Sequence, residues 1–236
     1  MSLLIAEVEL RIALARKRLL VLNMLVPLLL VVPVVLGAAP AFHASAVYAV
    51  LFMLFGTFGS AIPLVRDAEM GLVGRILQTG IRPGGFLVQR AAAGCTVDAV
   101  QLLPALAVAT FGSLSLGGFL TTFVIMWASL WIANLLGNIV AGMARSLAET
   151  ALFAAVTALF MLHFSGVFRT PMPGTFWGIV EAASPFRILH ETLLGMSVGA
   201  SVEGASALIV WAVVLPVLTL VVARPIATSL KVATRQ

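Results

Sequence analysis

The sequence predicts an all-α membrane protein with six transmembrane helices and an interfacial helix at the N-terminus. Two observations on composition lead to this fold class. Hydrophobic residues make up 61% of the 236 residues and charged residues only 10%, whereas a soluble domain carries about 25% charged residues. The mean hydropathy is +1.14. A third observation is that the apolar residues gather in runs, and these runs define a single transmembrane domain over 1–236.

Six apolar runs are long enough to cross a membrane. About 20 apolar residues at 1.5 Å per residue span the ~30 Å of hydrocarbon. Several runs contain prolines, which membrane helices tolerate because neighbouring helices and side chains can satisfy the freed backbone groups. The predicted spans are Leu19–Ala39, Ser45–Val65, Ala91–Gly112, Gly117–Met143, Leu147–Phe168 and Ala205–Ala223.

The segment before the first span (1–18) has the pattern of an amphipathic helix on the membrane surface. Leu4, Val8, Ile12 and Leu19 recur at helical spacing, and Glu7 precedes Arg11 by four residues, which favours an ion pair. The basic cluster and apolar run also resemble a signal peptide. The run is too long for one, so we expect this segment to be retained.

The basic residues orient the spans. With the N-terminus in the cytoplasm, twelve of the fourteen lysines and arginines fall on the cytoplasmic side, and only Arg169 and Arg187 fall outside. Cytoplasmic loops of membrane proteins carry such an excess of positive charge. We therefore expect both termini in the cytoplasm. The formal net charge of +5 then indicates orientation and lipid contact, and we expect no nucleic-acid partner.

Two polar segments interrupt the spans. The segment 66–90 is the longest charged island and should form a cytoplasmic loop with helical parts, in which Met70, Val73 and Leu77 make one apolar stripe. An interfacial helix that lies on lipid remains an alternative for it. The second segment, 169–204, is too polar and proline-rich to span, and predicts two short amphipathic helices dipping into the outer leaflet.

The chain lacks the motifs of several function classes. No Gly-x-x-x-x-Gly-Lys loop, Gly-x-Ser-x-Gly turn or His/Cys cluster with metal spacing is present, so we assign no catalytic and no metal-binding residues. This disfavours a membrane-embedded enzyme. A secondary transporter or channel should show an internal repeat and several buried ionisable groups, whereas Asp98 is the one intramembrane carboxylate that stands out.

Three stretches resemble one transporter family. The first is an acidic residue followed by Gly-x-x-x-Arg-x-Leu after the second span, formed by Glu69, Gly71, Arg75 and Leu77. The others are GNIVAGMARSLAETALFAAVTALFMLHFSGVF, with a short internal turn at Arg145, and SPFRILHETLLGM before the last span. In these features, which extend over most of its length, the chain resembles the ABC type-2 exporter permeases. One departure is that the proline of the loop comes late, at Pro83.

The resemblance implies a fold, partners and a role for the loop. It implies a homodimer or heterodimer of six-span subunits in a bacterial inner membrane, bound to two ABC ATPase subunits. The partner ATPase would bind ATP and Mg, and this chain would hold no cofactor. The loop would be a coupling loop seated in the ATPase, and the segment 169–204 a re-entrant hairpin. The ATPase-coupling candidates are Arg66, Asp67, Glu69, Gly71, Arg75 and Leu77.

A second group of candidates lies in the fourth span. Trp127, Trp131, Asn134 and Asn138 share one helical face. A side-chain amide in hydrocarbon without a partner costs several kcal/mol, so the asparagines should face protein or water. They would line a translocation path or a dimer interface, or make an ordinary interhelical hydrogen bond. Gly56 and Ser60 form a small-x-x-x-small pair that favours close helix packing.

Asp98 is the last path candidate. It lies eight residues after Arg90, so it could sit ~12 Å deep if the span begins there. If the span begins later, Asp98 is a carboxylate at the level of the lipid headgroups, and we favour this second interpretation. Arg90 and Gln101 are its natural partners.

These patterns together predict the membrane subunit of an ATP-driven exporter. Its substrate should be amphipathic or lipid-linked, because no charged central cavity is visible in the sequence. A secondary transporter or channel that is not driven by ATP is the alternative.

The orientation can be tested by labelling. Single cysteines placed at Gln78 and Ala233 should react only with a reagent admitted to the cytoplasm, because the positive residues hold these segments inside. A cysteine at Gly174 should react from outside. Labelling of the Gln78 position by an impermeant external reagent would contradict the orientation.

Overall fold

The computed structural model describes residues 4–37, 39–110, 116–168, 174–198 and 205–232. Within these ranges the chain is entirely helical apart from turns. The helices are α1 (Leu4–Ala15), α2 (Lys17–Leu36), α3 (Ala41–Glu69), α4 (Leu72–Gln78), α5 (Pro83–Thr110), α6 (Leu116–Met143), α7 (Leu147–His163), α8 (Phe176–Ala183), α9 (Pro185–Val198) and α10 (Ala205–Val232). The prediction of an all-α chain is confirmed.

Five of the described helices are long and apolar enough to cross a membrane, namely α2, α3, α5, α6 and α10. The fifth predicted span corresponds to α7, a shorter apolar helix of 17 residues. The count of six spans therefore stays a prediction for α7. Helix α5 begins at Pro83, eight residues before the predicted start at Ala91. Proline is favoured in the first turn because its fixed φ suits a helix and its missing N–H costs nothing there.

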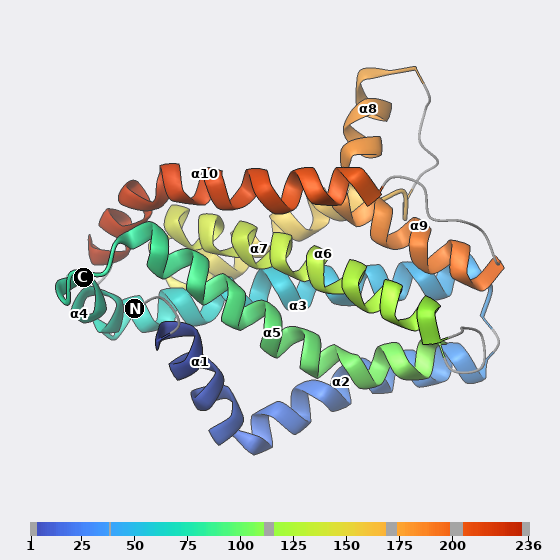
Figure 1. The fold of residues 1–236 in the computed structure, drawn as a ribbon, viewed down its shortest axis with the longest axis horizontal. Helices are drawn as coiled ribbons and strands as arrows, with labels where there is room; N and C mark the ends of the chain where they lie inside the picture. Colours follow the sequence, from blue (N-terminus) through green and yellow to red (C-terminus); the bar gives the residue numbers. More distant parts are fainter. Residues whose placement is uncertain (1–3, 38, 111–115, 169–173, 199–204, 233–236) are drawn as a thin grey trace.

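Helix α3 lies at the centre of the bundle. It packs most extensively on α6 and also contacts α7, α9, α5 and α2. Figure 1 shows the long helices running along one axis, with α4 and both ends of the chain at one end of the bundle. We call this the α4 end and the opposite one the α8 end. Prolines such as Pro63 and Pro104 lie inside these helices, as predicted.

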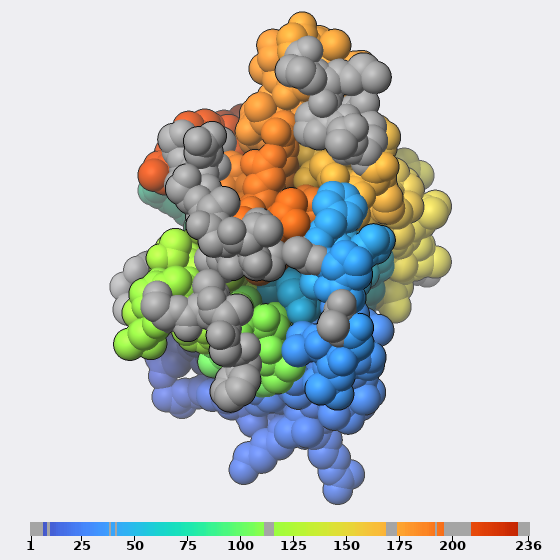
Figure 2. All heavy atoms as spheres, turned by 90° about the vertical axis from the view of Figure 1, so that its right-hand side faces the viewer, coloured from blue at the N-terminus to red at the C-terminus, as the bar shows by residue number. Residues whose placement is uncertain are grey.

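The two short helices predicted in the outer segment are present as α8 and α9, and they meet at Ser184. Thr175 caps α8 by accepting a hydrogen bond from the Gly178 amide at 3.0 Å. Figure 2, which looks onto the α8 end, shows α8 rising on one side of the bundle and α2 lying on the opposite side. Their insertion into a membrane leaflet stays a prediction, and residues 169–173 and 199–204 of this segment lie outside the described residues.

The N-terminal helix is also present, as α1, and the predicted pair between Glu7 and Arg11 forms within it. Helix α1 packs against α5. Helix α2 is poorly covered, since only Pro27 and Val31 are buried along its length. The surface position of α1 on lipid stays a prediction.

Helices α3 and α6 approach closely because small residues face each other. A Cβ atom at Gly137 would lie 2.6 Å from the Thr57 carbonyl oxygen and 3.1 Å from the Ser60 Cβ. Gly56 is equally tight against Ala133 of α6. The close packing predicted for Gly56 and Ser60 is therefore confirmed.

This close approach predicts the effect of a single methyl group. Gly137→Ala should lower the free energy of unfolding by roughly 1–3 kcal/mol, because the backbone at Thr57 must move to admit it. Gly85→Ala in α5 is the control, since a Cβ there meets no atom within 4 Å, and alanine favours a helix by about 1 kcal/mol. Thermal unfolding of the purified chain in detergent measures both. Equal melting temperatures of Gly137→Ala and Gly85→Ala would contradict the close contact between α3 and α6.

Candidate functional site

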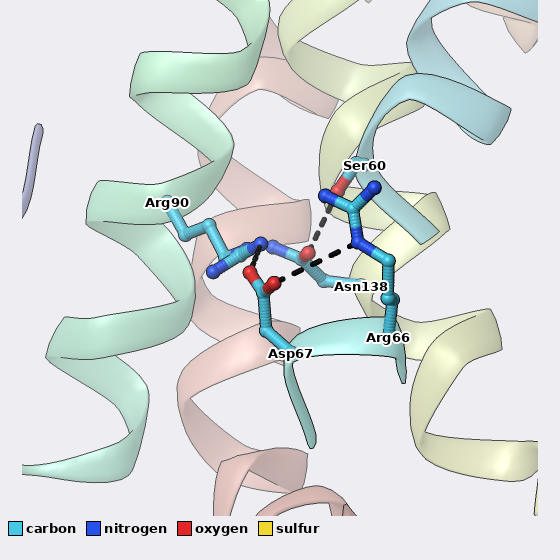
Figure 3. Close-up of polar contacts among 5 residues, drawn as sticks. All are labelled: Ser60, Arg66, Asp67, Arg90 and Asn138. Atoms are coloured by element: carbon cyan, nitrogen blue, oxygen red, sulfur yellow. Dashed lines mark hydrogen bonds and ion pairs between the residues drawn. The ribbon is translucent and has the colours of Figure 1, made fainter. Parts of the chain in front are cut away.

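The loop candidates Arg66 and Asp67 lie in the last turn of α3 and differ in exposure. Arg66 is exposed, whereas Asp67 is buried and pairs with Arg90 of α5 (Figure 3). The distance from Arg66 Nε to Asp67 Oδ1 is 4.0 Å, which is a long contact. The Arg90 guanidinium also lies 6.0 Å from the centre of the Phe86 ring. Asp67 therefore joins α3 to α5 inside this chain.

Glu69 joins two turns at the α4 end. Its Oε1 atom accepts a hydrogen bond from the backbone amide of Leu147, at 3.1 Å. Leu147 is the first residue of α7, where backbone amides have no partner within the helix and a negative charge is favourable. Ser146 caps the same helix by accepting from the Glu149 amide at 3.2 Å. The turn between α6 and α7 thus provides a hydrogen-bond donor for Glu69.

Gly71 ends the continuity between α3 and α4. Its φ of 72° lies in the left-handed region, which glycine adopts without a steric penalty. Glu69 and Arg75 therefore belong to different helices, α3 and α4.

The predicted apolar stripe is also partly wrong. Met70 lies before α4 and is 59% exposed. Val73 is buried, and Leu77, four residues later, packs on the same hydrophobic cluster, which includes Leu64 and Phe86. Arg75 is exposed on α4. Helix α4 thus buries one side in the bundle and leaves the other accessible.

Asn138 links three helices in the interior. Its Oδ1 atom accepts from Ser60 Oγ of α3 at 2.7 Å, and its Nδ2 atom donates to the Leu87 carbonyl of α5 at 2.9 Å (Figure 3). Ser60 Oγ also lies 2.9 Å from the Asn134 carbonyl oxygen. The Asn138 side chain is completely buried. This is the interhelical hydrogen bond that the sequence left open as one interpretation.

Asp98 lies deep in the bundle and pairs with Asn134. Its Oδ2 atom accepts from Asn134 Nδ2 at 2.9 Å. Helix α5 begins at Pro83, so Asp98 lies about 22 Å along a 28-residue helix. Its level in the membrane stays a prediction, as does a contact with Gln101. Arg90, the other predicted partner, pairs with Asp67.

Glycines make room for this pair. A Cβ at Gly59 would lie 3.0 Å from Asp98 Oδ1, and a Cβ at Gly94 would collide with Asn134 Oδ1. Both asparagines are 0% exposed. A dimer contact needs a residue that reaches the surface of one subunit, so neither asparagine supports that part of the prediction in this conformation.

The two tryptophans lie at the edge of this interior. Trp131 donates from Nε1 to the Ala212 carbonyl of α10 at 3.3 Å. Trp127 is about half exposed, and its carbonyl accepts from the Cys95 thiol at 3.3 Å. The helical face shared by the four candidates therefore runs from the surface at Trp127 into the core at Asn138.

A groove opens beside this interior, between α2, α3 and α5, and α1 closes one side of it. Its volume is about 870 Å³. Asp98, Gln101 and Asp67 lie in its wall, together with Arg16, Arg66 and Arg90. The sequence analysis did not predict this groove, because no periodic pattern connects α1 with α5.

Comparison with known proteins gives the family. The model of the ABC-2 type transporter family matches residues 10–197, which is most of the chain. The chain belongs to the ABC-2 type transporter family. It is therefore an integral membrane protein and a membrane transport component. No curated protein matches the sequence. Membership implies that the permease works with an ABC ATPase.

Sequence reasoning missed two residues that organise the permease. Ser60 was named only as a small residue, although its hydroxyl bonds both asparagine positions of α6. Arg90 was assigned to Asp98. A signal was available, because Asp67 and Arg90 are opposite charges near the two ends of the loop and could meet if α3 and α5 are antiparallel neighbours.

The buried pair predicts a double-mutant result. Arg90→Gln should lower the free energy of unfolding of the permease by about 3–5 kcal/mol, because it leaves the Asp67 carboxylate buried without its cation. Adding Asp67→Asn should recover part of the loss. Thermal unfolding in detergent measures the cycle. Arg75→Gln, at an exposed site, is the control and should stay within about 0.5 kcal/mol. An equal effect of Arg90→Gln and Arg75→Gln would contradict the pairing.

Proposed function

We propose that the permease is the membrane-spanning subunit of an ATP-driven exporter, powered by a separate ABC ATPase that docks on α4. The observation that carries the proposal is the form of the α4 end. Helix α4 has seven residues, and glycines with positive φ, Gly71 and Gly80, stand just before and after it. One side is anchored through Val73, and the other presents Arg75 to solvent. An anchored helix with a charged free side suits a protein partner.

Three connections would carry a push on α4 into the spans. Helix α4 follows α3 directly, so the first is the chain itself. The second is the pair of Asp67 with Arg90, which leads into α5. The third is the hydrogen bond from the Leu147 amide to Glu69, which leads into α7. Of the coupling candidates, Arg75 would touch the ATPase, whereas Asp67 and Glu69 would transmit its motion.

The assembly would contain two permease subunits, identical or related, and two ATPase subunits that bind ATP and Mg. The α4 end would face the cytoplasm of a bacterial cell, in the inner membrane, with both termini on that side. This orientation rests on the twelve basic residues that the sequence analysis assigns to the cytoplasm.

The substrate would be amphipathic or lipid-linked and would move outward. Among the path candidates, Trp127 is exposed at the flank of α6, whereas Asp98 is buried. Asn134 and Asn138 would hold α3, α5 and α6 together behind this flank. Leu120, Val124 and Trp127 are exposed and share one face of α6, and this apolar face suits a substrate with an apolar part.

Charge reversal at Arg75 tests the docking. Arg75→Glu should abolish most co-purification of the ABC ATPase and most ATP-driven transport, because rim charges read by a partner determine association. The melting temperature of the permease should not change, since Arg75 is exposed. The measurement is pull-down of the full-length permease from its native membrane, with the ATPase identified by its P-loop peptides and by vanadate-sensitive ATP turnover.

Two further variants separate docking from transmission. Arg18→Glu makes the same charge change at an exposed site in the first turn of α2, and should keep the ATPase bound. Glu69→Gln should keep the ATPase bound but reduce transport per ATP hydrolysed, because the contact to α7 is weakened. Normal ATPase recovery and transport with Arg75→Glu would refute docking on α4.

A further inference from the structure

We propose that the groove between α2, α3 and α5 binds an anionic phospholipid of the membrane. The phosphate would lie between Arg16 and Arg66, and an acyl chain would lie along the apolar walls. This lipid is a resident of the subunit and not the exported substrate, so the proposal does not depend on the exporter assignment. It follows from the shape, the walls and the charges of the groove.

The size and position of the groove fit a membrane lipid. Its volume of about 870 Å³ falls within the ~300–1,000 Å³ of ordinary ligand pockets. It is bounded by helices that are long and apolar enough to cross a membrane. Because α2 is buried at only two positions, this side of the subunit borders the membrane more than it borders the bundle. A lipid could therefore enter sideways.

The walls suit an acyl chain. Leu20 of α2, Phe55 and Phe58 of α3 and Val97 of α5 line the groove. Asp98 and Gln101 also lie in the wall, but they are only 5% and 6% exposed, so they present little polar surface. An apolar chain packed here removes hydrophobic surface without covering an exposed charge.

The charged residues that line the groove favour an anionic lipid headgroup. Arg16 stands at the corner between α1 and α2, and Arg66 in the last turn of α3; both are exposed and both line the groove. Of the two acidic residues in the lining, Asp67 pairs with Arg90 and lies 4.0 Å from Arg66 Nε, and Asp98 accepts a hydrogen bond from Asn134. Three arginines in the lining thus face two carboxylates. The mouth is thus cationic. Arginine binds phosphate oxygens through paired N–H groups, and basic pockets between membrane helices bind anionic head groups.

Native mass spectrometry of the full-length permease in detergent tests this. The probes are phosphatidylglycerol and phosphatidylcholine with the same acyl chains. We expect one phosphatidylglycerol retained per subunit, with an apparent affinity about tenfold above that of phosphatidylcholine. Both lipids carry a phosphate, but phosphatidylglycerol keeps its net negative charge, whereas the choline cation of phosphatidylcholine is repelled by the two arginines.

Matched variants assign the preference to the groove. Arg16→Gln with Arg66→Gln should remove the tenfold preference. The control is Arg145→Gln with Arg224→Gln, which removes the same charge from exposed positions that do not line the groove, and it should keep the preference. Val97→Trp fills the groove without changing charge and should release both lipids, with the melting temperature as the check on folding.

The alternatives give different results. Equal retention of the two lipids would overturn the proposal. So would a preference that survives Arg16→Gln with Arg66→Gln, or one that the control pair abolishes to the same extent, which would indicate general surface charge. Retention of a single-chain quaternary amine in place of phosphatidylglycerol, lost on Asp98→Asn, would assign the groove to a hydrophobic cation and overturn the lipid as occupant.

Discussion

A polar side chain enclosed by apolar helices must find its partner inside the bundle, and the contact among α3, α5 and α6 depends on this constraint. Asn138 bonds a hydroxyl of α3 and a carbonyl of α5, and Asn134 bonds the carboxylate of Asp98. Such bonds form only at one register of the three helices. Glycines at 94 and 137 allow the close approach that this register requires. Polar groups therefore specify how otherwise uniform apolar surfaces fit together.

The same register organises the α4 end. The interior bonds align α3 and α5. In this alignment Asp67, near the end of α3, pairs with Arg90 of α5, and Glu69 reaches the first turn of α7. The two turns at this end thus form one connected surface. A partner that moved α4 would act on three helices at once, α3, α5 and α7, through covalent, ionic and hydrogen-bonded links. The interior amides and the loop charges are parts of a single arrangement.

Composition and periodicity predicted the class of fold, the places of the long helices, α1 and the pair α8–α9, because these depend on local hydrophobicity. The start of α5 was misplaced because Pro83 was treated as part of a loop, although proline suits the first turn of a helix. The distance of Asp98 from the start of its helix was underestimated for the same reason. The partners of Asp67, Glu69 and Asn138 lie 23 to 78 residues away in sequence. Pairings at such separations arise from packing, and among them only the opposite charges of Asp67 and Arg90, near the two ends of the loop, gave a signal in the sequence.

Helix α4 is too short to persist by itself. Helices of fewer than about 12 residues are marginal in water, and α4 has seven. It is held in place by Val73, Ile76 and Leu77, which pack against the bundle. We therefore expect α4 to open locally without unfolding of the core, and its amide hydrogens to exchange with solvent through these small fluctuations. A partner that covered the free side of α4 would suppress these fluctuations. Part of the free energy of docking would then be used to order the helix. Hydrogen exchange at its seven backbone amides would report whether that side is covered.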